Sequence, residues 1–299
     1  MADQGVFMLQ LVITGVAVGG VYSLMALGFV LIFKASSVVN FGPGELVLFG
    51  AYVSWATILP MQLPLYVALP LTFGIAILLG LVIERGVLRP LIGEPIISVI
   101  MVTIALSTVF SALMKWMFGV NLQPFPRVFN TQNVNILGLQ VQTVYLMSLA
   151  VSLAMMVGMA WFFRFSKYGL AMRATAFSQQ VAQSLGISVK SVFAMAWAIS
   201  ATVSAVAGVV VAVVNGVSAG LSAYGIKVFP AAILGGLDSV GGAVLGGIII
   251  GLLENFAHFL DSEYLHWGNL YEIAPFYALI IILMIKPYGL FGTKDIERV

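Results

Sequence analysis

The chain has 299 residues, of which 61% are hydrophobic and only 8% are charged. Soluble domains carry roughly 45–50% apolar and about 25% charged residues. The 13 basic and 11 acidic side chains cannot cover the surface of a soluble protein of this size, so the composition predicts a multi-spanning membrane protein. A net charge of +2 gives no basic surface for nucleic acid, and the lack of cysteine excludes disulfides, thiolate metal sites and cysteine nucleophiles.

The first apolar stretch covers residues 4–33 without a charged side chain. It is longer than the roughly 20 residues that cross a hydrocarbon core. A cleavable signal peptide would need a basic stretch before its apolar run, but the only early charge is Asp3, and Lys34 follows the run. We therefore expect this segment to remain as a membrane anchor with the amino terminus outside.

Further apolar runs are long enough to span or nearly span a bilayer. They cover residues 46–59, 65–83, 96–114, 141–163, 191–214 and 273–285. The region 229–260 is longer than one span, and the Gly-rich sequence from Gly235 to Gly242 interrupts it, which predicts a short helix before the break. The predicted fold is an all-α polytopic membrane protein with about 8–9 transmembrane segments, including a broken or half helix near 228–242.

The placement of lysine and arginine predicts the orientation. With the amino terminus outside, ten basic residues fall on one side: Lys34, Arg85, Arg89, Arg164, Lys167, Arg173, Lys190, Lys286, Lys294 and Arg298. Three fall on the other: Lys115, Arg127 and Lys227. The positive-inside rule makes the basic side cytoplasmic. We therefore expect one transmembrane domain over residues 1–299, with a cytoplasmic carboxyl terminus, a cytoplasmic segment at 164–190 and an external loop at 115–140.

Pairs of glycines recur with small-xxx-small spacing. They are Gly15 and Gly19, Gly242 and Gly246, and Gly247 and Gly251. Such spacing lets membrane helices approach closely, and it is common in apolar helices. Helix packing within this chain is the favoured interpretation, and a dimer interface is the alternative.

The sequence from Asn40 to Glu45 lies between two apolar runs and contains Pro43 and two glycines, which cannot continue a regular helix. Backbone groups near the membrane must then find partners in protein or water, and broken helices of this kind often line transport pathways. Candidate pathway residues are therefore Asn40, Phe41, Gly44 and Glu45. The alternative is that Glu45 caps a helix start at the cytoplasmic surface, and both interpretations stay open.

Gly235, Gly236 and Asp238 are candidate pathway residues in the second interruption, or members of a turn between two helices. Glu254 and His258 have the i, i+4 spacing of one helix face, but two residues without a third ligand do not predict a metal site. We expect them at the outer interface, beside Asp261 and Glu263. No metal site is predicted.

The segment 164–190 carries the clearest cytoplasmic pattern. Residues 171–185 contain neither proline nor glycine and predict a short helix that ends at Gly186. Its small and apolar residues Ala174, Phe177, Val181 and Leu185 recur at intervals of three and four. Such a helix can cap a loop, lie on the membrane or fit a partner's groove.

Several motifs, in order along the chain, resemble the permease subunits of branched-chain amino acid ABC importers. They are the sequences of residues 22–28 (YSLMALG), 39–45 (VNFGPGE), 50–53 (GAYV), 232–243 (AILGGLDSVGGA) and 287–292 (PYGLFG). Arg173-Ala174, followed by the sequence of residues 184–187 (SLGI), resembles the coupling segment of the same family.

The resemblance implies a bacterial inner-membrane permease that pairs with a second, homologous permease, two ATP-binding subunits and an external substrate-binding protein. Family habit favours a different chain as the second permease, and a second copy of this chain is the alternative. The resemblance also implies that the segment 171–185 docks on an ATPase subunit, with coupling residues Arg173, Ala174, Phe177, Ala182, Leu185 and Gly186. The family usually has charged residues where this chain has Phe177, Ser178, Gln179 and Gln180. Insertion of the apolar Phe177 would replace charge pairs there.

The sequence contains no Gly-Lys pair, so it lacks a P-loop. The leading hypothesis is therefore a non-catalytic permease subunit that binds no cofactor, while its partners use ATP and Mg. Its few charges suit a small amino acid or a neutral metabolite better than a multiply charged ligand, and the resemblance implies a small hydrophobic, branched-chain amino acid or a related small metabolite. The alternative is a stand-alone secondary transporter or channel for a small neutral solute such as urea or a short amide, with Glu45 or Glu254 as a protonatable carrier. An intramembrane enzyme is poorly supported, since no motif pairs His258 or His266 with a nucleophile.

Overall fold

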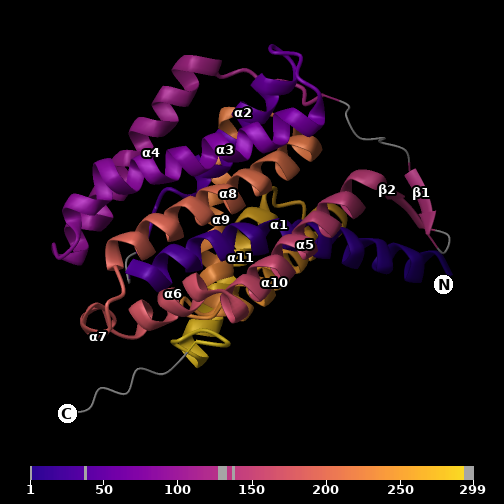
Figure 1. Cartoon of the computed structure of the whole chain (residues 1–299). Coiled ribbons are helices and arrows are strands. Elements are labelled where there is room, and N and C mark those ends of the chain that lie inside the picture. The colour runs from indigo at the N-terminus through magenta and orange to yellow at the C-terminus, as the bar shows by residue number, and fades with distance from the viewer. Residues whose placement is uncertain (1, 37–38, 127–132, 137–138, 293–299) are drawn as a thin grey trace. The chain divides into compact units, whose positions relative to one another are not determined.

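The computed structural model describes residues 2–36, 39–126, 133–136 and 139–292 of the chain (Figure 1). The chain divides into two compact units. Unit 1 comprises Met1–Ala26, Phe129–Met156 and Lys227–Val299, and unit 2 comprises Leu27–Val128 and Val157–Ile226.

The described residues are mainly helical. The α-helices are α1 (Ala2–Ser36), α2 (Pro43–Ile58), α3 (Leu65–Ile83), α4 (Ile96–Phe118), α5 (Thr143–Phe165), α6 (Lys167–Phe177), α7 (Gln179–Ser184), α8 (Val189–Asn215), α9 (Tyr224–Gly235), α10 (Val240–Leu260) and α11 (Leu270–Ile285). Short π-helices cover Glu84–Leu88 and Asp261–Leu265, and short 3₁₀-helices cover Arg89–Leu91 and Ala219–Ala223.

Six helical stretches are long and apolar enough to cross a membrane. They are Phe7–Ser36, Leu65–Leu91, Ile96–Phe118, Thr143–Phe165, Val189–Asn215 and Val240–Leu265. Each predicted apolar run coincides with a helix, and the short helix expected before the Gly-rich break is α9, so the polytopic membrane fold is confirmed. Because α2, α9 and α11 are shorter, the count of 8–9 transmembrane segments stays a prediction. The orientation of the chain in the membrane also stays a prediction. Three basic residues used for that orientation, Arg127, Lys294 and Arg298, lie outside the described residues.

The prediction of a purely helical chain is corrected by a short hairpin. Strand β1 (Asn133–Ile136) pairs antiparallel with β2 (Leu139–Gln142), so that Ile136 lies opposite Leu139. The expected external loop at 115–140 also begins later than predicted. Lys115 lies in the last turn of α4, because apolar residues extend this helix as far as Phe118 and Gly119 ends it with a positive φ of 81°. Residues 127–132 and 137–138 of this loop lie outside the described ones.

Unit 2 is built around α8, against which α2 and α3 pack, and Figure 1 shows α3 and α8 side by side. Glycines allow the close approach. A Cβ atom added at Gly50 of α2 would lie 2.6 Å from the carbonyl oxygen of Ala205, and one at Gly80 of α3 would lie 2.6 Å from that of Trp197. Gly208 of α8 faces the backbone of Val47 in the same way. This is the small-residue packing expected where no hydrophobic effect drives helices together.

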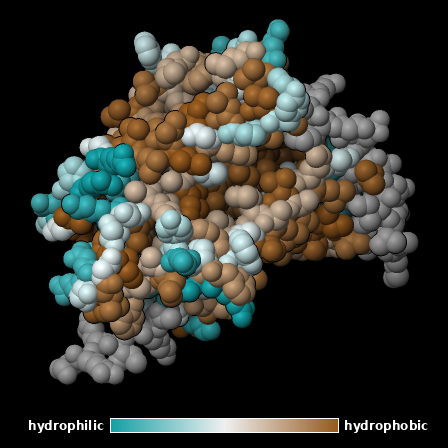
Figure 2. All heavy atoms as spheres, viewed as in Figure 1, coloured by the Kyte–Doolittle hydropathy of each residue, from teal (hydrophilic) through white to brown (hydrophobic). Residues whose placement is uncertain are grey.

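The outer helix of unit 2, α4, is mostly exposed and apolar. Its exposed side chains include Ile97, Met101, Val109 and Trp116. Figure 2 shows hydrophobic residues along α3 and α4, whereas hydrophilic residues gather where α4 begins. This distribution fits a helix whose middle faces lipid and whose start lies near a membrane surface.

In unit 1, α1 and α10 pack through small residues. A Cβ atom at Gly19 would lie 2.7 Å from Cα of Ile248, and Gly247 faces the backbone of Ser23. The Ser23 hydroxyl donates a hydrogen bond of 2.7 Å to the carbonyl of Val244. These contacts confirm that Gly19 and Gly247 serve helix packing within the chain, as do Gly15 and Gly251.

Replacing Gly208 by alanine should lower the free energy of unfolding by about 1–3 kcal/mol, because the added methyl group meets the backbone of α2. Thermal unfolding of the purified chain, followed by tryptophan fluorescence, measures the effect. Gly74→Ala is the matched control, since a Cβ atom at Gly74 of α3 has no neighbour within 4 Å. Equal stability of the two variants would contradict the packing of α2 on α8.

Candidate functional site

The break between α1 and α2 is closed by a turn around Asn40. Oδ1 of Asn40 accepts a hydrogen bond of 2.9 Å from the backbone N–H of Gly42, which precedes Pro43 at the start of α2. Because this N–H can only donate, the side-chain oxygen must face it and the NH₂ group must point away. Asn40 is 3% exposed, and its Nδ2 has no hydrogen-bond partner among the described residues.

Glu45 lies in the first turn of α2, but it does not cap the helix. The cap residue is Gly42, which has no side chain to accept from the N–H groups of the first turn. The carboxylate of Glu45 is buried beside α4, where Ser107 donates a hydrogen bond of 3.2 Å to Oε1. Oε2 is buried without a partner among the described residues. The alternative of a capping residue at the surface is therefore wrong.

Gly44 and Phe41 have different environments in the same break. A Cβ atom at Gly44 would lie 2.9 Å from Cα of Gly225, so two backbones touch at this point. Phe41 is partly exposed, and its N–H lies 3.4 Å from Oγ1 of Thr103 on α4. The start of α2 is thus held between α4 and the residues that begin α9.

A cavity of about 230 Å³ opens beside this break, entirely within unit 2. Its polar lining includes Asn40, Glu84, Arg89, Glu94, Thr103 and Gln179. A smaller void of about 20 Å³ shares Asn40 and Trp197 with it and reaches Glu45 and Ser107. The cavity therefore joins the predicted pathway residue Asn40 to Gln179, a residue of the predicted coupling segment.

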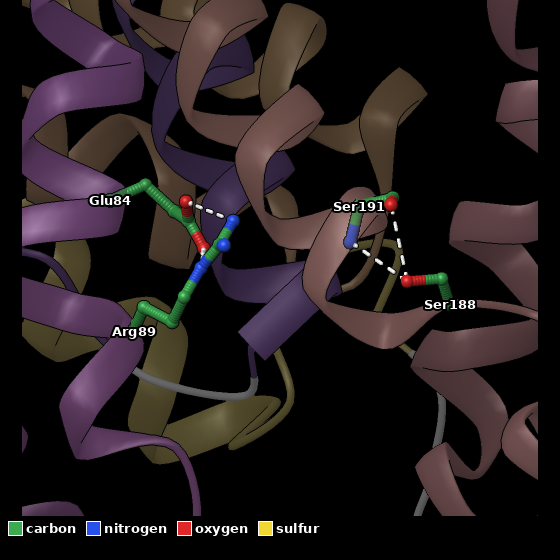
Figure 3. Close-up of polar contacts among 4 residues, drawn as sticks. All are labelled: Glu84, Arg89, Ser188 and Ser191. Carbon is green, nitrogen blue, oxygen red and sulfur yellow. Dashed lines mark hydrogen bonds and ion pairs between the residues drawn. The ribbon is translucent and has the colours of Figure 1, made fainter.

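Sequence analysis missed the ion pair in this cavity (Figure 3). Nε and Nη2 of Arg89 donate to the two carboxylate oxygens of Glu84 at 3.0 and 2.9 Å, the forked geometry of a strong pair. Glu84 is 1% exposed at its side chain and Arg89 33%. The π-helix Glu84–Leu88 brings these residues together, because its i→i+5 bond joins the N–H of Arg89 to the carbonyl of Glu84. A sequence signal was present in Glu84, an acid that directly follows an apolar run.

The Gly-rich interruption forms a joint in unit 1. Helix α9 ends at Gly235, Gly236 has a positive φ of 107°, and Ser239 caps α10 by accepting a hydrogen bond of 3.0 Å from the N–H of Gly242. Gly235 and Gly242 face each other so closely that neither has room for a Cβ atom. Asp238 lies half-buried in the turn.

The carboxyl-terminal sequence completes this joint. The N–H groups of Leu290 and Phe291 donate to the carbonyls of Leu234 and Gly235 at 2.8 and 3.2 Å. They satisfy acceptors that the end of α9 leaves free. Gly235, Gly236 and Asp238 thus belong to a joint of unit 1, whereas Asn40, Phe41, Gly44 and Glu45 belong to unit 2.

Glu254 is bonded to groups other than the neighbouring His258. Its carboxylate accepts hydrogen bonds from Lys227 of α9 and from the hydroxyl of Tyr22 of α1, both at 2.5 Å. Asp261, also expected at the outer interface, accepts from the backbone N–H groups of Trp267, Gly268 and Leu270. Among the described residues, no group of three or more metal-binding side chains is found.

The segment 164–190 contains two helices in place of the single one predicted over 171–185. Helix α6 begins earlier, at Lys167, and the chain leaves the helical region at Ser178 with φ −159° and ψ 119°. Ser178 breaks the helix because its hydroxyl caps α7, accepting from the N–H of Val181 at 3.3 Å. Gly186 ends the segment with a positive φ of 81°, as expected of a C-terminal stop. Ser188 then caps α8 through bonds to Ser191 (Figure 3).

The two helices expose apolar side chains while other predicted coupling residues face inward. Phe177 is 90% exposed, and Val181 and Leu185 are also exposed. In contrast, Ala182 is 1% exposed, and Arg173 donates from Nη1 to the carbonyl of Phe163 at the end of α5. Ala174 is half-buried. Arg173 thus anchors the segment on α5, and Phe177, Val181 and Leu185 form its exposed apolar surface.

Comparison with known proteins identifies relatives along the whole chain. Residues 11–285 match the family described as branched-chain amino acid transport system / permease component. The chain is 30% identical over 314 aligned positions to the high-affinity branched-chain amino acid transport system permease protein LivH of Escherichia coli (strain K12), with 100% of both chains covered. It is 31% identical over 308 positions to the corresponding permease protein BraD of Pseudomonas aeruginosa, covering 97% of this chain and 98% of BraD.

One solved structure is similar in fold. The structure of PsaBC from Streptococcus pneumoniae in complex with Fab matches with a TM-score of 0.52 and 18% identity, over 95% of this chain and 94% of that chain. This likeness bears on the fold alone. The relatives and the six apolar helices together identify a multi-pass protein of the bacterial inner membrane.

Removing either partner of the pair between Lys227 and Glu254 should destabilise unit 1, because the other charge remains in a largely buried position. We expect Glu254→Gln and Lys227→Met each to lower the free energy of unfolding by roughly 3 kcal/mol. The double variant should lose less than the sum of the two single variants. Thermal unfolding of all four proteins measures this coupling, and strictly additive losses would show that the two side chains do not interact.

Proposed function

Because this chain belongs to the family of permease components of branched-chain amino acid transport systems, we propose that it is the membrane-spanning subunit of an ATP-driven ABC importer. The transported solute would be a small hydrophobic, branched-chain amino acid or a related small metabolite. The observation that carries this proposal is the similarity to LivH and BraD along the whole chain.

The proposed importer contains further subunits. A second, homologous permease of different sequence would complete the membrane part, two ATP-binding subunits would use ATP and Mg, and an external binding protein would deliver the solute. In this arrangement the chain is a non-catalytic subunit that binds no cofactor. The sequence supports this division because it contains no Gly-Lys pair with which a P-loop could hold phosphates.

We propose that α6 and α7 receive the motion of an ATP-binding subunit on the cytoplasmic side. Phe177, Val181 and Leu185 are exposed and apolar, as expected of side chains that insert into a partner's groove. Arg173 would transmit the motion because it bonds to the end of α5, and the buried Ala182 would support α7 from within. Ala174 and Gly186 would shape the two ends of this docking surface.

The solute pathway would run beside the two breaks in the helices. In unit 2, Asn40, Phe41, Gly44 and Glu45 would flank it, with buried polar atoms of Asn40 and Glu45 that lack partners among the described residues. In unit 1, Gly235, Gly236 and Asp238 would form a joint at which α9 and α10 move relative to each other. In other transporters too, discontinuous helices form the solute site, and rigid parts move around it to give alternating access.

Reconstitution into proteoliposomes tests the proposed function. Leucine uptake should require the ATP-binding subunits, the second permease, the external binding protein and ATP on the side that carries α6 and α7. Uptake by this chain alone, driven by a proton gradient and indifferent to ATP, would replace the proposal by the stand-alone transporter with Glu45 or Glu254 as carrier.

Phe177→Asp should weaken coupling while leaving the fold intact, because Phe177 is 90% exposed. Loss of one anchoring aromatic at an interface costs about 2 kcal/mol, so uptake at limiting concentrations of the ATP-binding subunit should fall at least about tenfold. Thermal unfolding should stay unchanged. Met61→Asp, also at an exposed apolar residue but between α2 and α3, is the control and should transport normally. Normal uptake by the Phe177 variant would remove this side chain from the docking surface.

A further inference from the structure

The lining of the cavity in unit 2 combines polar with apolar side chains. Its polar groups are the Glu84–Arg89 pair, Glu94, Gln179 and the buried amide of Asn40. Its apolar wall includes Ile32, Leu88, Leu91, Ile96, Val99 and Trp197. We propose that this cavity is a binding site for a zwitterionic amino acid with a branched apolar side chain, an assignment that rests on the proposed function for its choice of solute.

The size of the cavity suits a small metabolite. Its volume of about 230 Å³ is far above the roughly 30 Å³ that one water molecule occupies in the liquid. It is also below the range of about 300–1,000 Å³ that is typical of sites for drug-sized ligands. An amino acid of the size of leucine or valine therefore fits the space better than a nucleotide or a peptide.

Two residues of this lining, Asn40 and Arg89, carry N–H groups that could donate to a carboxylate. The NH₂ group of Asn40 is buried and lacks a partner among the described residues, although a lone buried donor is costly. Arg89 uses Nε and Nη2 for Glu84, so its Nη1 remains outside that pair. Together these groups offer N–H donors to the carboxylate of an amino acid.

An acceptor for the ammonium group comes from Glu94. Because Glu84 and Arg89 neutralise each other, Glu94 is the remaining formal charge among the cavity residues. The pocket is thus net negative by one charge and contains separate positive and negative groups. This pattern favours a zwitterion over a simple anion, while the aliphatic wall and Trp197 supply the contact surface for a branched side chain.

The site also touches the segment proposed to couple to the ATP-binding subunit. Gln179, the first residue of α7, lines the cavity, and Phe177 lies two residues before it on the exposed surface. A bound amino acid would therefore contact the chain next to the coupling surface. The proposed site therefore lies at the end of the pathway near α6 and α7.

Equilibrium dialysis with radiolabelled leucine, using the full chain in lipid nanodiscs, tests the site. Leucine should bind, and two analogues that each lack one charged group, 4-methylpentanoate and 3-methylbutylamine, should bind at least about tenfold more weakly. If 3-methylbutylamine binds as tightly as leucine, the site recognises a cation and the proposal is wrong. If 4-methylpentanoate binds as tightly as leucine, the site recognises an anion and the proposal is also wrong.

Asn40→Asp is the sharpest variant, because a carboxylate keeps the acceptor for Gly42 but replaces the free NH₂ group by an oxygen. Repulsion of the ligand carboxylate should weaken leucine binding at least about tenfold. The control Asn121→Asp makes the same change at an exposed residue outside the cavity and should bind normally. Thermal unfolding of both variants shows whether the fold is kept.

Glu94→Gln provides a second, independent measurement, should the Asn40 variant fail to fold. Glu94 is exposed, and its loss should weaken leucine binding about tenfold without weakening that of 4-methylpentanoate. Glu263→Gln, at another exposed glutamate in unit 1, is its control. Equal leucine affinity in Glu94→Gln and Glu263→Gln would overturn the assignment.

The binding measurements and the uptake measurements can fail separately. ATP-dependent leucine uptake together with undiminished leucine binding in the Asn40 and Glu94 variants would refute this site but leave the proposed function standing. Leucine binding that depends on Asn40 and Glu94, without any ATP-dependent uptake, would support the site and refute the importer.

Discussion

The structure depends on one constraint: in a chain this apolar, every backbone group freed by a broken helix must find a partner in the protein or in water. The break after α9 shows how the constraint acts. The carbonyls of Leu234 and Gly235 have no partner in their own helix, and the N–H groups of Leu290 and Phe291 bond to them. The end of the chain is therefore part of the joint between α9 and α10. Any motion of this joint must carry the carboxyl-terminal segment with it.

Close backbone contact follows from the same constraint, because the broken ends must approach the elements that satisfy them. Gly235 meets Gly242 in unit 1, and Gly44 meets Gly225 in unit 2. These contacts leave no space for side chains, so the glycines are required by packing whether or not a solute passes nearby. Among the described residues, buried polar side-chain atoms without a partner occur at Asn40, Glu45, Trp55, Ser152 and Ser204, and of these Asn40 and Glu45 lie at a break between helices. A functional interpretation of the breaks therefore rests on these two side chains more than on the glycines.

Apolar runs in the sequence were sufficient to predict the long apolar helices, since a membrane span needs only length and a lack of charge. Features that depend on a partner distant in the sequence or on irregular backbone could not be found in this way. The pair of Glu84 and Arg89 needs a π-turn, which regular helical periodicity does not contain. The bond between Lys227 and Glu254 joins two helices, and Ser178 interrupts a sequence that has helical composition throughout. Inward-facing Ala182 and outward-facing Phe177 likewise become distinct only once α6 and α7 have been positioned.

The orientation of the Asn40 amide matters both for the break before α2 and for the cavity beside it. Its oxygen is used to close the turn before α2, so the same side chain that shapes the break must direct its NH₂ group away from it. An unbonded buried donor costs about 1–3 kcal/mol, and the neighbouring void of about 20 Å³ has room for one water molecule at most. A ligand oxygen in the larger cavity would recover that cost. Gln179 of α7 lines the same cavity as Asn40. A ligand bound at Asn40 and the position of α7 would therefore affect each other through this cavity. Ile96, Val99 and Thr103 of α4 line this cavity together with Gln179 of α7, so a displacement of either helix would change its volume.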